Sequence, residues 1–177
     1  MKLRLSLHVW FLTILLSAVS VSCASIPNEH ISLASFTENY VEVSVYLEHN
    51  SEGRYILSGI FTPPDGYHLY SKDISINGVD GLGRPTLLEL TPSSLIKATG
   101  ELIESVKAQE SDFEPRELLV YPLGAVTLSL PVELPSGHDW IDDEIKITYM
   151  ACSASQCKPP VVGKIVPVRV PGIDAIR

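Results

Sequence analysis

The sequence predicts an all-β domain, built as a sandwich or a barrel, and three observations lead to this fold class. Apolar and polar residues alternate along several short segments, as they do in strands that bury one face. Glycine and proline turns separate these segments at intervals of roughly 8–12 residues, which is typical of sandwiches and barrels. A convincing helical period is missing: the best helix candidate, residues 93–107, is weakened by Thr99 and Gly100.

The first predicted element is a β-hairpin over residues 41–62. Its first strand alternates strictly, with valine or leucine at positions 41, 43, 45 and 47. The turn signal Asn-Ser-Glu-Gly follows at residues 50–53, and residues 55–62 form the return strand. Further strands are expected at residues 67–76, 85–91, 97–107, 117–121, 125–133, 143–151 and 161–170.

The composition supports one globular domain. The chain has 177 residues, of which 45% are hydrophobic and 19% charged, and these proportions exclude a disordered chain. The formal net charge of −8 argues against nucleic acid as a partner, because no basic stripe is present to neutralise phosphates. Three cysteines are too few for a fold that is built on disulfides.

The N-terminus carries the features of an export signal. Lys2 and Arg4 precede an apolar, uncharged run over residues 5–21, and small residues follow it. We expect a signal peptide over residues 1–24, a flexible arm over residues 25–39, and the folded domain over residues 40–172, in a periplasmic or other extracytoplasmic location. Two alternatives stay open: a retained membrane anchor, or a lipoprotein signal that ends before Cys23 and makes Cys23 the lipidation site.

Two cysteines near the C-terminus, Cys152 and Cys157, are separated by four residues between two alternating segments. We expect a hairpin in which Cys152 ends one strand and Cys157 opens the next, with the sulfurs close enough to bond. Closing a loop of about six residues stabilises a fold by only about 2.2 kcal/mol in the chain-entropy model. Such a pair suits thiol–disulfide exchange, although an inert structural disulfide has the same spacing, and both interpretations stay open.

Other chemistry has less support. Two thiolates would need two further metal ligands, and the histidines show no ligand-like spacing, so neither a metal nor another cofactor is expected. Lys158 is expected to be an exposed turn charge beside Cys157. The acidic residues Asp139, Asp142, Asp143 and Glu144 match no calcium-binding loop, and we expect them to form a solvated turn.

The segment TYMACSASQCKPP, which holds both cysteines, resembles the active-site hairpin of the N-terminal periplasmic domain of the DsbD thiol:disulfide interchange family. The family pattern is approximately Tyr-Gln-x-Cys, a few residues, then Cys-x-Pro-Pro. Three further segments agree with the family: PPDGYHLYSKDI, GLGRPTLLEL and VYPLGAVTLSLPVEL. Together they extend the resemblance over residues 40–170.

The resemblance implies an immunoglobulin-like β-sandwich that acts as a protein-disulfide reductase without a cofactor. Its cysteine pair would receive electrons from a membrane-embedded donor and pass them to periplasmic thioredoxin-fold oxidoreductases. The alternative is a non-catalytic immunoglobulin-like binding module, with or without a lipid anchor, in which the disulfide is structural.

The resemblance also implies a set of site residues. Cys152 and Cys157 match the redox pair, and an aromatic cap over the disulfide is expected at Phe113, flanked by Asp112 and Glu114. Tyr70 and His68 match the aromatic positions that line the site. Cys152 is expected to attack more often than Cys157, yet in the family the more C-terminal cysteine bonds the partner on at least one side of the relay, so both roles stay open.

The sequence departs from the family pattern in three places. The loop between the cysteines has four residues, and Met150 stands where many relatives have glutamine. The membrane and thioredoxin-like domains that usually follow are missing before the end at Arg177. We therefore expect the electron donor to be a separate protein.

Overall fold

The computed structural model describes residues 30–50 and 52–176, and within these ranges the fold is built from short strands and one 3₁₀ turn. The predicted signal peptide, the start of the predicted arm and Cys23 lie outside the described residues. Within them, no helix is long and apolar enough to cross a membrane. The strands are β1 (His30–Glu38), β2 (Val41–His49), β3 (Tyr55–Thr62), β4 (His68–Leu69), β5 (Leu87–Leu90), β6 (Lys97–Ala98), β7 (Ile103–Glu104), β8 (Val126–Glu133), β9 (Trp140–Tyr149), β10 (Ala151–Cys152) and β11 (Val161–Pro171), followed by the 3₁₀ turn η1 (Ile173–Ala175).

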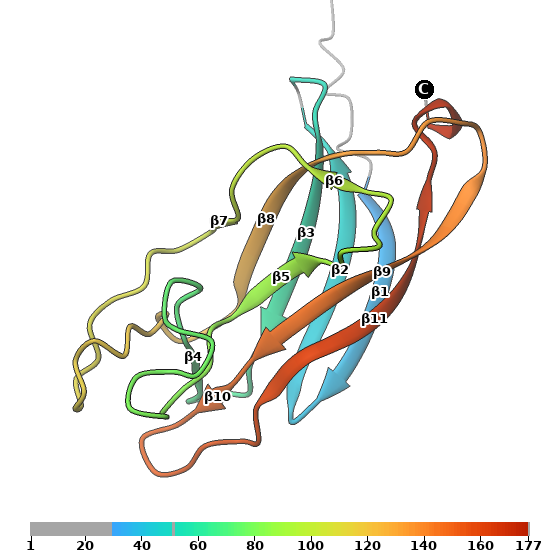
Figure 1. Cartoon of the computed structure of the whole chain (residues 1–177). Coiled ribbons are helices and arrows are strands. Elements are labelled where there is room, and N and C mark those ends of the chain that lie inside the picture. The colour runs from blue at the N-terminus through green and yellow to red at the C-terminus, as the bar shows by residue number, and fades with distance from the viewer. Residues whose placement is uncertain (1–29, 51, 177) are drawn as a thin grey trace, which may run out of the picture.

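Two antiparallel sheets form the body of the domain (Figure 1). The larger sheet has the strand order β1-β2-β3-β8-β6, with β7 also paired to β8, and the smaller has the order β11-β9-β5. A separate two-stranded ladder pairs β4 with β10, at the end of the sandwich opposite η1 (Figure 1). This ladder carries the first of the two paired cysteines.

One hydrophobic core fills the space between the two sheets. Val41, Val43 and Val45 of the larger sheet are buried in the same cluster as Ile145 and Ile147 of the smaller sheet. The ring of Phe61 in β3 meets the ring of Tyr149 in β9 edge-on, with 5.9 Å between the ring centroids. The prediction of an all-β, immunoglobulin-like sandwich is confirmed.

The predicted hairpin over residues 41–62 is also confirmed. Strands β2 and β3 pair with Glu42 opposite Thr62 and Val45 opposite Gly59. The alternation in β2 matches its burial, because positions 41, 43, 45 and 47 face the core and Glu42 faces solvent. Gly59 has little space above its backbone, since an added Cβ would lie 3.2 Å from the ring of Phe61.

Residues 30–38 differ from the expected arm, because they form edge strand β1 against β2. Ile31, Leu33 and Phe36 are only partly buried where they pack on the core. The register also shifts between Ser32 and Ala34, and such a bulge breaks the period of two that would have marked the strand.

The weak helix candidate at residues 93–107 forms no α-helix, and the strand expected at residues 97–107 is present only as the short strands β6 and β7. Two other strand expectations were wrong in detail. The strand expected at 67–76 ends after Leu69, because the Ser71 hydroxyl accepts a hydrogen bond from the Asp73 amide in a turn. Residues 117–121 form no strand of the sheets: Val120 makes isolated bridges, and the backbone of Leu119 and Tyr121 bonds to Ser71 and Leu69.

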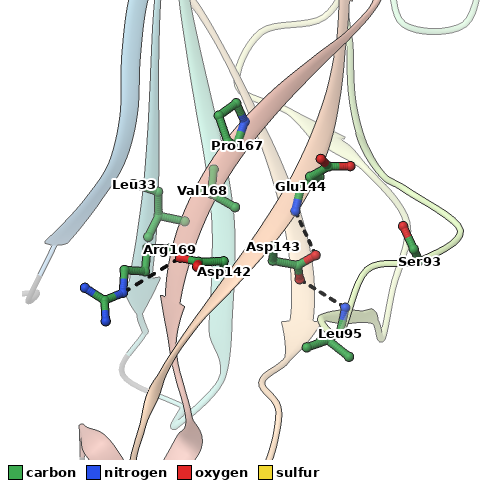
Figure 2. A pocket seen from close by; sticks show the side chains of 9 residues that line it. All are labelled: Leu33, Ser93, Leu95, Asp142, Asp143, Glu144, Pro167, Val168 and Arg169. Carbon is green, nitrogen blue, oxygen red and sulfur yellow. Dashed lines mark hydrogen bonds and ion pairs between the residues drawn. The ribbon is translucent and has the colours of Figure 1, made fainter.

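The acidic cluster is not a solvated turn, because Asp142, Asp143 and Glu144 lie within β9 (Figure 2). Asp143 is buried, and its Oδ2 accepts hydrogen bonds from the amides of Leu95 and Ile96 at 3.0 and 3.2 Å. Its Oδ1 accepts from the Glu144 amide at 2.8 Å. The carboxylate therefore ties a distant loop to β9, a role that the spacing of acidic residues does not reveal.

Candidate redox site

The cysteine hairpin has the predicted form in part. Cys152 ends β10 and forms a disulfide with Cys157, but Cys157 pairs with it in an isolated antiparallel bridge and does not open the next strand, because β11 begins at Val161. Ser153 organises the turn, since its hydroxyl accepts hydrogen bonds from the amides of Ser155 and Gln156 at 3.3 and 3.2 Å. The backbone closes the same turn through Ser153 N–H to Gln156 C=O at 2.8 Å. A local hydroxyl thus brings the cysteines together.

The two cysteines differ sharply in exposure. Cys152 is only 2% exposed and packs in a small cluster with Tyr70, Ile74 and Leu118. Cys157 belongs to the exposed side of the hairpin. An incoming thiolate must reach one sulfur along the axis of the disulfide, so access favours attack at Cys157 and departure of Cys152.

The segment that carries Phe113 is fixed at its base. Ser111 is buried, and its hydroxyl donates hydrogen bonds to the carbonyls of Phe113 and Pro115. Reciprocal backbone bonds of 2.8 Å between Gln109 and Val120 close the loop below it. Phe113 itself stays 42% exposed, with its ring 5.7 Å from the ring of His68. The structure therefore presents an aromatic side chain on a tethered loop beside the β4–β10 ladder.

An apolar pocket of about 300 Å³ opens beside the disulfide. Cys157 and Phe113 both line it, together with Tyr70, Leu118 and Met150. Burial raises the pKa of the Tyr70 phenol to about 12, so this phenol stays uncharged well above neutral pH. The pocket could receive an apolar side chain next to a partner's reactive sulfur.

Arg84 also lines this pocket. Its guanidinium donates hydrogen bonds to the carbonyls of Asn77, Gly81 and Gly83 and so holds the loop in shape. Gly78 permits the tight turn in this loop, because a Cβ there would lie 1.9 Å from the Leu82 carbonyl oxygen and φ is +77°. Arg84 was not singled out from the sequence, because its contacts are visible only when the loop is folded.

His68 lies on the other side of Phe113, in a second pocket of about 420 Å³ that also includes Ala154 of the cysteine turn. Its ring meets the ring of Tyr70 edge-on at 5.2 Å. Burial lowers the pKa of His68 below its ordinary value of 6.5, so the neutral imidazole dominates at neutral pH.

Lys158 is more than the exposed turn charge that the sequence predicts. Its Nζ lies 4.2 Å from the centroid of the Tyr40 ring and 5.1 Å from that of Tyr67. Tyr40 is 70% exposed and adopts a left-handed φ of 67°, which is uncommon for an aromatic residue. The hairpin tip between β1 and β2 is thereby linked to the residue that follows Cys157.

The predicted site residues are partly brought together. Cys157, Phe113 and Tyr70 share one pocket, and His68, Phe113 and Asp112 share the other. Glu114 lines neither of these pockets, and its exposed carboxylate pairs with Arg116 at 3.5 Å. The functional roles of all these residues stay predictions.

The chain matches no known family model and no curated protein. Among solved structures it is similar to the crystal structure of the DsbD N-terminal domain from Neisseria meningitidis in its reduced form. The two share 20% identity over 66% of this chain and 76% of that one, with a TM-score of 0.41. This is the family that the cysteine motif resembles, and membership of it stays a prediction.

Proposed function

We propose that this domain is an extracytoplasmic thiol–disulfide exchange module that carries two electrons in the Cys152–Cys157 pair. The observation that carries the proposal is the unequal burial of the two cysteines on one short hairpin. An exposed sulfur can exchange with a docked partner, while the buried sulfur is held beside it to close the ring again.

The surroundings of Cys157 support exchange with a protein rather than with small thiols. Phe113 lines the pocket beside Cys157 from a loop that Ser111 anchors, and this pocket is largely apolar. A docking partner can displace the Phe113 ring and fill the pocket, whereas a small polar thiol gains little from doing so. The cap would thus limit unwanted exchange.

The proposed direction of electron flow follows the family resemblance of the cysteine motif. A membrane-embedded donor with a reduced dithiol would reduce the pair, and thioredoxin-fold oxidoreductases would be its acceptors. Export through the predicted signal, with or without lipidation at Cys23, would place the domain in the same compartment as these acceptors.

Exchange is tested with the reduced domain and oxidised protein disulfide isomerase as the acceptor, a thioredoxin-fold protein whose potential of about −180 mV is at least as oxidising as the range expected for this pair. We expect wild-type protein to reduce the acceptor, with thiols counted by alkylation and mass. Cys152→Ser should stall as a mixed disulfide through Cys157, because the resolving thiol is gone. Cys157→Ser is the matched control and should form no stable adduct.

Two results would overturn the proposal. One is a wild-type pair that stays reduced in the presence of excess oxidised acceptor, under conditions in which dithiothreitol reduces the same acceptor. The other is equal adduct formation by Cys152→Ser and Cys157→Ser, which would mean that the hairpin does not distinguish its two sulfurs. The domain would then be better described as a binding module with a structural disulfide.

A further inference from the structure

His68 carries an unsatisfied polar atom next to the disulfide. Its Nε2 is buried and has no hydrogen-bond partner among the described residues. Leaving a buried polar nitrogen unpaired costs about 1–3 kcal/mol, and such atoms in folded proteins call for an explanation. In the disulfide form, neither cysteine has an S–H group that could donate to this nitrogen.

Strand pairing places His68 in line with both cysteines. His68 lies directly opposite Cys152 in the β4–β10 ladder, and Cys152 lies directly opposite Cys157 in the next bridge. Directly opposite residues in antiparallel pairs project from the same face, with their Cβ atoms about 5 Å apart. Cys152 therefore stands between the imidazole and the exposed sulfur.

The other titratable groups near the imidazole are less well placed than His68 to accept a proton from the Cys152 thiol. The phenols of Tyr70 and Tyr121 face the same region, and burial raises the pKa of each above its ordinary value of 10. The carboxylates of Glu110 and Asp112 line the outer part of the pocket that His68 shares, on exposed residues. Of these groups, His68 alone sits opposite Cys152 in the ladder.

We propose that His68 is the proton acceptor for the Cys152 thiol when the reduced pair closes its disulfide. The inference rests on the proposed exchange function and extends it to the resolving step. In the reduced protein the freed Cys152 thiol would donate its S–H to Nε2 of His68 and so satisfy that nitrogen.

The reaction balances with glutathione disulfide as the oxidant. The Cys157 thiolate attacks one glutathione sulfur, forms a mixed disulfide and releases the first glutathione as a thiolate. The Cys152 thiol then passes its proton to Nε2 of His68, and its sulfur attacks Cys157. The Cys152–Cys157 bond forms, the second glutathione leaves as a thiolate and takes the proton, and two electrons have moved from the pair to glutathione.

The enclosure of His68 suits this role. Phe113 covers the imidazole on one side and Tyr70 meets it on another, so bulk water does not compete freely for Nε2. A neutral imidazole is the form that can accept a proton, and a thiolate–imidazolium pair is stabilised where solvent is excluded.

The test measures the lifetime of the glutathione adduct by acid quench and mass spectrometry between pH 6 and pH 9. In wild-type protein the resolving rate should change little with pH above the pKa of His68. His68→Phe keeps an aromatic ring but removes the base, so its rate should be about 100-fold lower at pH 7. It should then rise about tenfold per pH unit, because hydroxide must deprotonate Cys152.

His49→Phe is the matched control, since His49 stacks on Tyr55 in the β2–β3 hairpin and has no place in the cysteine ladder. It should keep the wild-type profile. A His68→Phe protein that resolves its adduct at the wild-type rate, with the wild-type pH profile, would overturn the inference and leave the proposed exchange function standing. A wild-type protein that forms no adduct would overturn both.

A second measurement avoids any change at His68. The ¹⁵N shift of Nε2 reports hydrogen bonding at that nitrogen. Cys157→Ala leaves the Cys152 thiol free, so its Nε2 shift should match that of the reduced wild-type protein. Cys152→Ala removes the donor, and its Nε2 shift should resemble that of the disulfide form. Equal shifts in the two variants would contradict the proposed S–H to Nε2 bond.

Discussion

Phe113 lines the pocket beside Cys157, with its backbone fixed through Ser111 and its ring 5.7 Å from the ring of His68. Phe113→Ala should leave stability almost unchanged, because the side chain is 42% exposed. Reduction of the Cys152–Cys157 bond by dithiothreitol should become at least about fivefold faster, which corresponds to about 1 kcal/mol of lost shielding. Stopped-flow alkylation measures the rate, and an unchanged rate would exclude a capping role.

His68 also predicts how stability depends on pH. Burial lowers its pKa in the folded protein, so the unfolded chain binds more protons as the pH falls below about 6.5. Its contribution to stability is present above that pH and is lost as the pH falls through 6.5 toward the lower folded value. Urea unfolding gives the free energy of unfolding at about pH 5.5 and at about pH 7.5. The difference between these two free energies should be smaller for His68→Phe than for wild type. An equal difference in both proteins would contradict this linkage.

At the scale of elements, Asp143 makes a clear structural prediction. Its carboxylate accepts the amides of Leu95, Ile96 and Glu144, so Asp143→Ala leaves these donors without their partner. We expect a loss of about 2–4 kcal/mol in the free energy of unfolding, with a smaller loss for Asp143→Asn, which keeps one acceptor oxygen. Exchange should be unaffected, since Asp143 lies in the first half of β9 and the cysteine hairpin follows the other end of that strand.

Elements whose pattern is local could be predicted from the sequence. The hairpin over residues 41–62 follows from strict alternation and a turn signal, and the cysteine turn follows from two cysteines between alternating strands. Strand β1 escaped prediction because its bulge interrupts the alternation. The weak helix candidate at residues 93–107 is not a helix, and the strand expected at residues 97–107 is reduced to two short pieces that pair with β8.

Only those residues of the candidate site that belong to segments resembling the family could be predicted from the sequence. The cysteines and the aromatic positions 68, 70 and 113 were found through their resemblance to a family. Arg84, Tyr40 and the orphaned Nε2 of His68 depend on contacts between distant segments. Such contacts leave no spacing signal in a single sequence, because each partner is brought by a different loop.

For the molecule as a whole, we expect the sandwich to form without its disulfide. Cys152 packs in a small cluster apart from the main core, and the sulfurs close a loop of only about six residues. The double variant Cys152→Ala, Cys157→Ala should therefore fold, with a loss of about 2 kcal/mol in chemical denaturation. A failure to fold would mean that the disulfide serves the architecture rather than exchange.

The reduction potential of the Cys152–Cys157 pair tests the central claim most directly. The mature domain would be equilibrated in graded dithiothreitol and glutathione buffers, and its free thiols counted after alkylation. An exchange module predicts a potential within the range of thiol oxidoreductases, about −180 to −270 mV. A value well below about −300 mV would contradict the account and identify the hairpin bond as structural.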